Sequence, residues 1–231
     1  MKGRYPIRCV HCLCISVLLC AATLSGCVGL RWDPPLRSGE PPDPAQAMDA
    51  MSRSAPVRLQ VVNSVLFEYR GRKMSGLGFL DVDAAKRTFG LACMTPSGVT
   101  LFQVTGSNGD VRCHFALEAF TNRGAFAETL GRDVERMFFD VRPPPGSSVS
   151  IEPGAAVFAH SGDSDRVEWV VSSDGVLLEK RYYEKQRLVC RIGYYPSIEK
   201  TPRWIPGRVC LQNLKYGYGL TVTVREIRRC D

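Results

Sequence analysis

Short apolar–polar alternation, broken at brief intervals by turn-like residues, constrains the fold of this chain more than any other feature. Within residues 57–70, Val65, Phe67 and Tyr69 share one face, which is the period of a half-buried strand. The tetrapeptide at 95–98 (TPSG) is typical of the turns between such strands. Strands are expected at 57–70, 74–82, 87–94, 99–105, 111–119, 167–171, 176–183, 186–194, 208–214 and 218–227. Short turns between consecutive strands predict antiparallel pairing.

The period changes once in mid-chain. Phe126, Leu130 and Val134 recur at helical spacing, which predicts one amphipathic helix over 125–139. A sheet of nine or more strands tends to curl, and one helix cannot cover a whole concave face. The expected fold is therefore mainly β with one principal helix, a single curved antiparallel sheet forming a half-open barrel with an apolar cavity. A closed small barrel fits the same periodicity.

The N-terminus has the layout of a secretory signal. Lys2, Arg4 and Arg8 precede a run from residue 10 to 24 that contains no Asp, Glu, Lys or Arg and is short for a membrane span. The run closes on Leu24-Ser25-Gly26-Cys27, which resembles a bacterial lipobox. That resemblance implies cleavage after residue 26 and acylation of Cys27. An uncleaved signal anchor and an ordinary secretory signal are the alternatives.

Acyl chains on Cys27 would hold the protein at a bilayer, because each buried methylene contributes about 0.8 kcal/mol. In lipoproteins of double-membraned bacteria, Asp after the acylated Cys retains the protein at the inner membrane, and this chain has Val28. The resemblance therefore implies a lipid-anchored protein on the periplasmic face of the outer membrane.

A proline-rich segment follows Cys27. Six prolines between residues 34 and 56, with few large apolar neighbours, predict an extended tether over 27–55. The expected organisation is a signal peptide at 1–26, an acylated tether at 27–55 and one folded domain at 56–231.

Charge and cysteine content exclude several classes of site. The net charge of the whole chain is +7, no Lys/Arg-rich block occurs, and nucleic acid is not an expected partner. The cysteines after Cys27 lack paired metal-ligand spacing, so no metal site is expected. If a loop centred on residue 200 joins two antiparallel strands, Cys190 and Cys210 lie opposite each other and could form a disulfide.

The order of these features resembles the LolA/LolB-like outer-membrane lipoproteins. The resemblance rests on the lipobox, the tether, Met74-x-Gly76-x-Gly78-Phe79, the Pro96 turn, the mid-chain helix, an Asp174-Gly175 hairpin and Gly217-Tyr218-x-Leu220. It implies a half-barrel whose apolar cavity holds acyl chains, a lipid or acylated protein as ligand, a periplasmic carrier protein as partner and a role in lipid or lipoprotein localisation.

The resemblance also implies site residues. A lipid cavity would be lined by apolar side chains of the strands, namely Phe67, Leu91, Phe102, Phe115 and Trp169, although ordinary core packing is the more common explanation for each. LolB-type members insert an apolar residue, usually Leu, into the bilayer from the turn matching Met94, Pro96, Ser97 and Gly98. Here Ser97 occupies that place, and a hydroxyl does not favour membrane insertion.

Two other function classes, an enzyme and a scaffold protein, are alternatives to lipid binding. The residues at 160–165 (HSGDSD) include all the types of a catalytic triad, but triads recruit separated positions, and no nucleophile elbow or dinucleotide fingerprint occurs. Neither catalysis nor a cofactor is therefore expected. A ligand-free scaffold lipoprotein with a filled barrel is the alternative.

Overall fold

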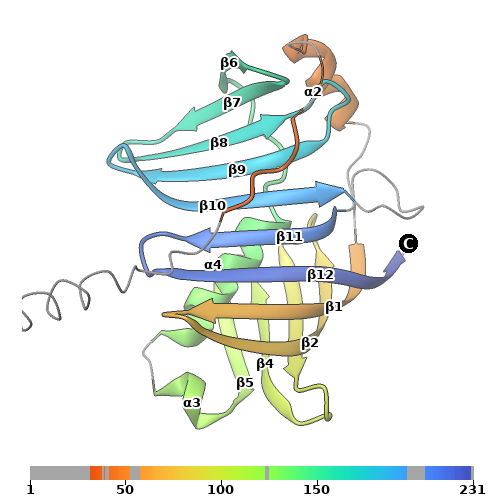
Figure 1. Ribbon diagram of the computed structural model, residues 1–231, viewed down its shortest axis with the longest axis vertical. Helices are drawn as coiled ribbons and strands as arrows, with labels where there is room; N and C mark the ends of the chain where they lie inside the picture. The colour runs from red at the N-terminus through yellow and green to blue at the C-terminus, as the bar shows by residue number, and fades with distance from the viewer. Residues whose placement is uncertain are drawn as a thin grey trace, which may run out of the picture. The chain divides into compact units, whose positions relative to one another are not determined.

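The computed structural model describes residues 32–37, 39, 42–52, 58–122, 125–196 and 206–229. Cys27 and the expected signal peptide lie outside these residues. The described part contains one 12-stranded antiparallel sheet (Figure 1). Its strands are β1 (Arg58–Tyr69), β2 (Arg72–Asp83), β3 (Thr88–Met94), β4 (Thr100–Ser107), β5 (Asp110–Ala116), β6 (Ser148–Glu152), β7 (Ala155–Ser161), β8 (Asp165–Val171), β9 (Leu177–Glu184), β10 (Arg187–Pro196), β11 (Pro206–Asn213) and β12 (Tyr218–Arg229).

Neighbouring strands of the sheet are consecutive in the chain, except in the middle of the sheet, where β1 lies beside β12. Its spatial order is β5-β4-β3-β2-β1-β12-β11-β10-β9-β8-β7-β6, so the first and last strands pair with each other. Tyr69 lies opposite Tyr218 in that pairing. Tight turns such as Asn108-Gly109, with φ of 49° and 91°, join neighbouring strands, and their left-handed backbone matches the twist of a hairpin.

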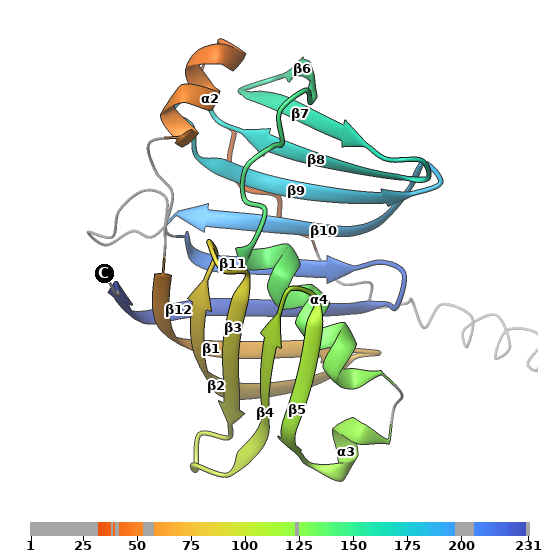
Figure 2. The same cartoon turned by 180° about the vertical axis from the view of Figure 1, so that it is seen from behind.

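The sheet is curved and its edge strands, β5 and β6, are not paired with each other, which confirms the half-open barrel (Figure 2). The principal helix, α4 (Phe126–Phe138), lies against one face, here called the inner face, and the opposite face is called the outer face. The helix agrees closely with its predicted range. Among the described residues no helix has the length and apolar content needed to cross a membrane.

Apolar side chains of the inner face form the main core beneath α4. At β1–β4, Val61, Leu80 and Val104 pack against Val134 of the helix. At β10–β12, Ile192, Leu211 and Val222 pack with Met137. Alternate residues of each strand reach this face because side chains alternate between the two faces of a sheet.

The expected tether is wrong for much of its length. Residues 44–52 form the helix α2 (Pro44–Ser52), and its Ala47 and Met51 are buried against Phe158 and Trp169 on the inner face. Asp43 accepts a hydrogen bond from the backbone N–H of Ala45 at 2.9 Å, which caps the start of the helix. Pro44 follows the cap, where its missing N–H costs nothing.

Residues 32–37, here called the strap, lie on the outer face. Tyr195 donates a hydrogen bond to the carbonyl oxygen of Asp33, and Arg37 forms ion pairs with Glu152 and Glu179. The strap therefore contacts β6, β9 and β10 on the outer face, whereas α2 packs on β7–β9 on the inner face. Only residues 28–31 separate Trp32 from Cys27.

The sequence also failed to predict three elements near the middle of the chain. Strands β6 and β7 lie between residues 140 and 166, where no strand was expected, and a short helix, α3 (Glu118–Thr121), replaces the end of the strand expected at 111–119.

Candidate functional site

One row of mutually paired residues crosses the inner face from β2 to β6. Each member lies directly opposite the next in the strand register. In order, the row is Met74, Phe67, Leu220, Leu211, Ile192, Lys180, Trp169, Phe158 and Val149. All members except Lys180 are apolar. We call this set the inner row.

The inner row is buried in the middle and open at its two ends. Leu211 and Ile192 are 2% and 0% exposed, whereas Met74 and Val149 are 36% and 48% exposed. An apolar surface therefore continues past the part that the protein covers itself.

Lys180 interrupts the row because it binds the end of α4. Its Nζ donates hydrogen bonds to the carbonyl oxygens of Arg136 at 2.9 Å and Phe139 at 3.3 Å. These carbonyls lack intrahelical partners at a helix C-terminus, where a cation is also favoured. Burial lowers the pKa of Lys180 to about 7. Tyr194 donates to the carbonyl of Met137 at 3.1 Å.

A second polar contact joins the middle of α4 to the sheet. Tyr218 of β12 donates a hydrogen bond to Oδ2 of Asp133, and Nδ2 of Asn213 donates to the Tyr218 hydroxyl at 3.1 Å. Burial raises the pKa of Asp133 to about 6. Its Oδ1 has no hydrogen-bond partner among the described residues. The helix is therefore attached by buried polar contacts as well as by apolar packing.

The five residues expected to line a cavity separate into two groups. Phe67, Leu91, Phe102 and Trp169 lie on the inner face, where they pack in its apolar clusters. The prediction is wrong for Phe115, which pairs with Gln103 on the outer face and is 45% exposed. A register shift between Gln103 and Val104 sets this orientation, and a bulge of this kind is not visible in an alternation pattern.

Trp169 is fixed by a hydrogen bond as well as by packing. Its Nε1 donates to the carbonyl oxygen of Asp140 at 2.8 Å, just beyond α4. This bond ties β8 to the end of the helix. The sequence identified the residue but not this positioning role.

The turn expected to enter a membrane is an exposed tip. Pro96, Ser97 and Gly98 are exposed, and Met94 is the last residue of β3. The hydroxyls of Ser97 and Thr95 lie 2.8 Å apart, and Thr95 Oγ1 accepts from the N–H of Val99 at 3.0 Å. The membrane role of this turn stays a prediction.

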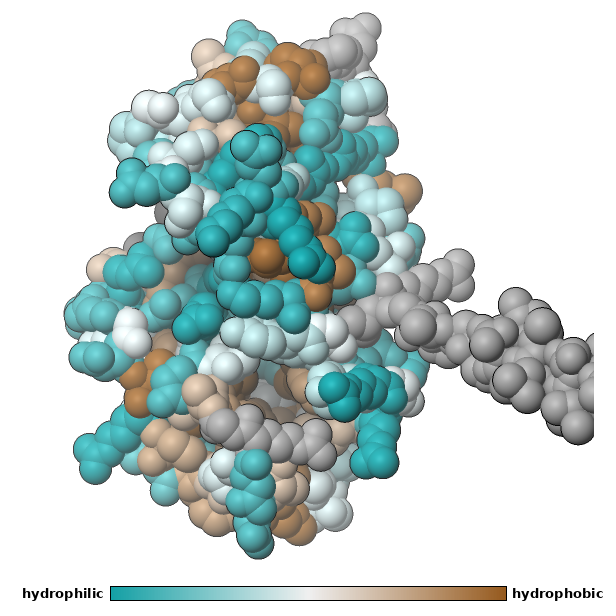
Figure 3. All heavy atoms as spheres, turned by 90° about the vertical axis from the view of Figure 1, so that its left-hand side faces the viewer, coloured by the Kyte–Doolittle hydropathy of each residue, from teal (hydrophilic) through white to brown (hydrophobic). Residues whose placement is uncertain are grey.

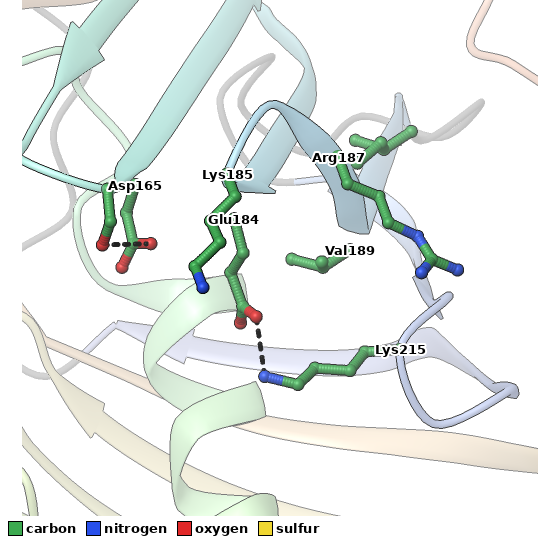
Figure 4. Close-up of a pocket in the computed structure, with 8 residues that line it drawn as sticks. Asp165, Glu184, Lys185, Arg187, Val189 and Lys215 are labelled. Carbon is green, nitrogen blue, oxygen red and sulfur yellow. Dashed lines mark hydrogen bonds and ion pairs between the residues drawn. The ribbon is translucent and has the colours of Figure 1, made fainter.

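Two open pockets occur within the described part of the chain. One, of about 530 Å³, lies where β9 turns into β10, and Asp165, Glu184, Lys185 and Lys215 contribute to its wall (Figure 4). Lys215 and Glu184 form an ion pair at 2.7 Å across it. Figure 3 shows hydrophilic side chains surrounding a hydrophobic patch at this end. The other, of about 600 Å³, lies along Phe79 and Ala92 of the sheet.

The expected disulfide is wrong. Cys190 lies opposite Asn213, Cys210 lies opposite Gly193, and both thiols are free. The register is offset by three residues from the one expected, and an odd offset places the two side chains on opposite faces of the sheet.

Groups suited to catalysis or metal binding do not converge in the described part of the chain. No cluster of three or more His, Cys, Asp or Glu side chains able to hold a metal occurs there. His114 shares a hydrogen bond with Thr105 at 2.8 Å on the exposed strand β5. His160 lies near the end of β7.

No family model and no curated protein matches the sequence. A solved structure of a LolA superfamily protein from Nitrosomonas europaea matches with a TM-score of 0.53 at 10% identity, over 81% of this chain and 93% of that one. The fold is LolA-like. A DUF1329 family protein from Desulfovibrio piger matches with a TM-score of 0.44 at 12% identity, over 80% of this chain and 90% of that one.

The site residues that the sequence did not reveal are polar. Lys180 and Asp133 follow ordinary strand and helix patterns, and a buried charge leaves no periodic signal. A lysine at an inward position of β9 was the available sign, because an inward lysine is rarely buried without a partner.

Proposed function

We propose that this chain is a lipid-anchored protein of the bacterial cell envelope that binds acyl chains on the inner face of its sheet. The observation that carries the proposal is the inner row, whose apolar surface extends beyond the cover provided by α4 and α2. The LolA-like fold supports it. Acylation of Cys27, a position at the outer membrane and receipt of ligand from a periplasmic carrier belong to the same proposal.

The contacts of α4 suggest how a ligand would enter. The apolar core beneath the helix is packed. An acyl chain must therefore either bind at the exposed ends of the inner row or displace the helix. Displacement would break the hydrogen bonds of Lys180 and Tyr218, each worth about 1 kcal/mol or more because one partner is charged or buried. Apolar contact would offset that loss at roughly 25 cal/mol per Å².

Native mass spectrometry of the purified mature protein tests the proposal, with the denatured mass accounting for its own covalent acyl groups. A bound phospholipid, fatty acid or acylated peptide is expected. Leu220→Trp places a larger side chain in the inner row, where it would occupy space needed by a ligand, and should weaken uptake of a fluorescent fatty acid. Thr221→Trp is the matched control, because the adjacent residue faces the other side of the sheet. Equal uptake by both variants would contradict binding on the inner face.

A ligand-free scaffold is the second candidate function. The observation that favours it is the free edge strand β6, where Val149 and Ile151 are each 48% exposed. Unpaired edges are ready sites for pairing with another chain. A mature protein that carries no lipid and takes up none would favour this function.

A further inference from the structure

The strap fixes the place where the chain leaves the folded domain toward Cys27. The guanidinium of Arg191 lies 4.1 Å from the centre of the Trp32 ring on the outer face of β10. A Cβ atom at Gly193 would lie 3.1 Å from the same ring, so the glycine allows this close approach. Trp32 is therefore seated against β10 and does not belong to a free tether.

The distance between this point and the lipid anchor is short. Four residues, 28–31, separate Cys27 from Trp32. Fully extended, the five steps from residue 27 to residue 32 span at most about 18 Å. An acylated Cys27 would therefore hold the outer face of β10 close to the bilayer surface.

Arginines without carboxylate partners lie on the outer face beside the strap. The Arg208 guanidinium lies 4.2 Å from the centre of the Tyr195 ring, and Nε of Arg225 donates to the hydroxyl of Ser64 at 3.3 Å. Within the described residues neither arginine forms an ion pair. Arg208 and Thr223 are paired across β11 and β12, and Thr223 is paired with Ser64, so these groups form one surface.

The acidic groups of the same face are mostly neutralised. Glu226 pairs with Arg228 at 2.8 Å, and Glu179 pairs with Arg181 at 3.1 Å. Asp33 is the exposed exception beside Tyr195. The surface thus combines a net positive charge with Trp and Tyr rings, the composition found where proteins meet a membrane interface.

We infer that the outer face of β10–β12, marked by Arg191, Arg208 and Arg225, rests on the anionic headgroups of the membrane that anchors the chain. The inference rests on the proposed acylation of Cys27. In this orientation the inner face and α4 are turned away from that bilayer toward the aqueous compartment, where a carrier protein could reach them.

Photo-cross-linking in proteoliposomes tests the orientation. The mature acylated protein is reconstituted in phosphatidylethanolamine–phosphatidylglycerol vesicles with benzoylphenylalanine at Thr223 on the outer face or at Glu128 on α4. Lipid adducts are expected at position 223 and not at 128. Comparable adducts at both positions, or adducts at 128 alone, would overturn the inference.

Charge variants identify the surface responsible. Arg208→Gln with Arg225→Gln should reduce the adduct yield at position 223 by about fivefold for each arginine, since one basic residue near an anionic surface is worth about 1 kcal/mol. Lys185→Gln with Arg187→Gln removes the same charge at the β9–β10 turn and should leave the yield unchanged. A larger loss with the turn variant would place the membrane at that end of the sheet instead.

Two further measurements keep the outcomes separate. If the Thr223 variant does not fold, quenching by headgroup-labelled nitroxide lipid is compared between the unaltered chain and Trp32→Phe, and loss of most quenching is expected. Quenching that is unchanged in Trp32→Phe would overturn the inference. The intact mass of the protein reports acylation of Cys27 directly, so failure of the proposed anchor is distinguished from failure of the orientation.

Discussion

Gly131 of α4 lies against Val111 of β5 so closely that a Cβ atom on the glycine would be 2.2 Å from Val111 Cγ2. No real Cβ atom tolerates that distance, so the helix reaches its position only because residue 131 has no side chain. The position of α4 on the inner face thus depends on one glycine as well as on the polar contacts of Lys180 and Tyr218.

Gly131→Ala should therefore move the helix and destabilise the protein. Overpacking costs roughly 1–3 kcal/mol, and the better helix propensity of Ala recovers about 1 kcal/mol. A net loss of about 1 kcal/mol in the free energy of unfolding is expected by denaturant titration. Adding Val111→Ala should restore part of the loss by making space. A double variant no more stable than Gly131→Ala would show that this contact does not position the helix.

Two buried titratable groups, Asp133 on α4 and Lys180 beneath its C-terminal end, predict an unusual dependence of stability on pH. The pKa of Asp133 is raised to about 6, so the folded state binds more protons than the unfolded state between about pH 4 and 6, and stability falls as pH rises through that window. The pKa of Lys180 is lowered to about 7, so the unfolded state binds more protons above pH 7, and stability rises again toward pH 9.

Thermal unfolding between pH 4.5 and 9 should consequently show a minimum near pH 6–7. Asp133→Asn should flatten the stability profile below the minimum, and Lys180→Met should flatten it above the minimum. Neither substitution should change the slope on the other side. Above pH 9, ionisation of Cys93, whose pKa burial raises to about 11, adds an opposing slope. A monotonic profile would mean that the two groups do not titrate as buried residues.

The ion pairs of Arg37 predict how firmly the strap is held. Hydrogen bonds from Arg181 and Arg37 lower the pKa of Glu152 to about 2 despite partial burial. Arg37→Gln should increase hydrogen exchange in residues 32–37 and cost about 1 kcal/mol of stability, the upper range for partly exposed pairs. Arg58→Gln, at the Asp81 ion pair of β2, is the matched control and should leave exchange in the strap unchanged.

Thiol reactivity should follow burial. Cys113 is exposed, whereas burial raises the pKa of Cys190 to about 12 and also raises that of Cys210. In a Cys230→Ser background at pH 8, a thiol reagent is expected to modify Cys113 quickly and the others only on unfolding, because the thiolate is the reactive form. Rapid modification of Cys190 would contradict its burial beneath α4.

The parts of the fold that the sequence predicted are those with a clear period. The helix at 126–138 and the long strands either alternate strongly or show helical spacing, so their boundaries were close. Strand β7 was missed because Ala155, Ala156, Val157 and Phe158 are all buried, the first and third on the outer face and the others beneath α2. A run buried on both sides has no alternation to detect.

The N-terminal segment was misread for a different reason. Its prolines indicated an extended chain, yet Asp43-Pro44 is also the start signal of a helix, and two apolar residues on one face sufficed to dock it. For the candidate site, Phe67 and Trp169 lie on the inner face, and their role in lining a lipid cavity stays a prediction. Neither the bulge that reverses Phe115 nor the burial of Lys180 can be predicted without the register of the sheet.

The pairing of β1 with β12 has a consequence for when the protein can fold. Each hairpin on either side could form as soon as its own residues are available, but the joint between the two halves requires residues near both ends of the domain, Leu59 and Arg229 among them. Contacts of such wide sequence separation slow folding, because the loop that they close loses much entropy first. The pairing of β1 with β12 can therefore form only after residues 218–229 have been synthesised, which would suit the export that the proposed function requires.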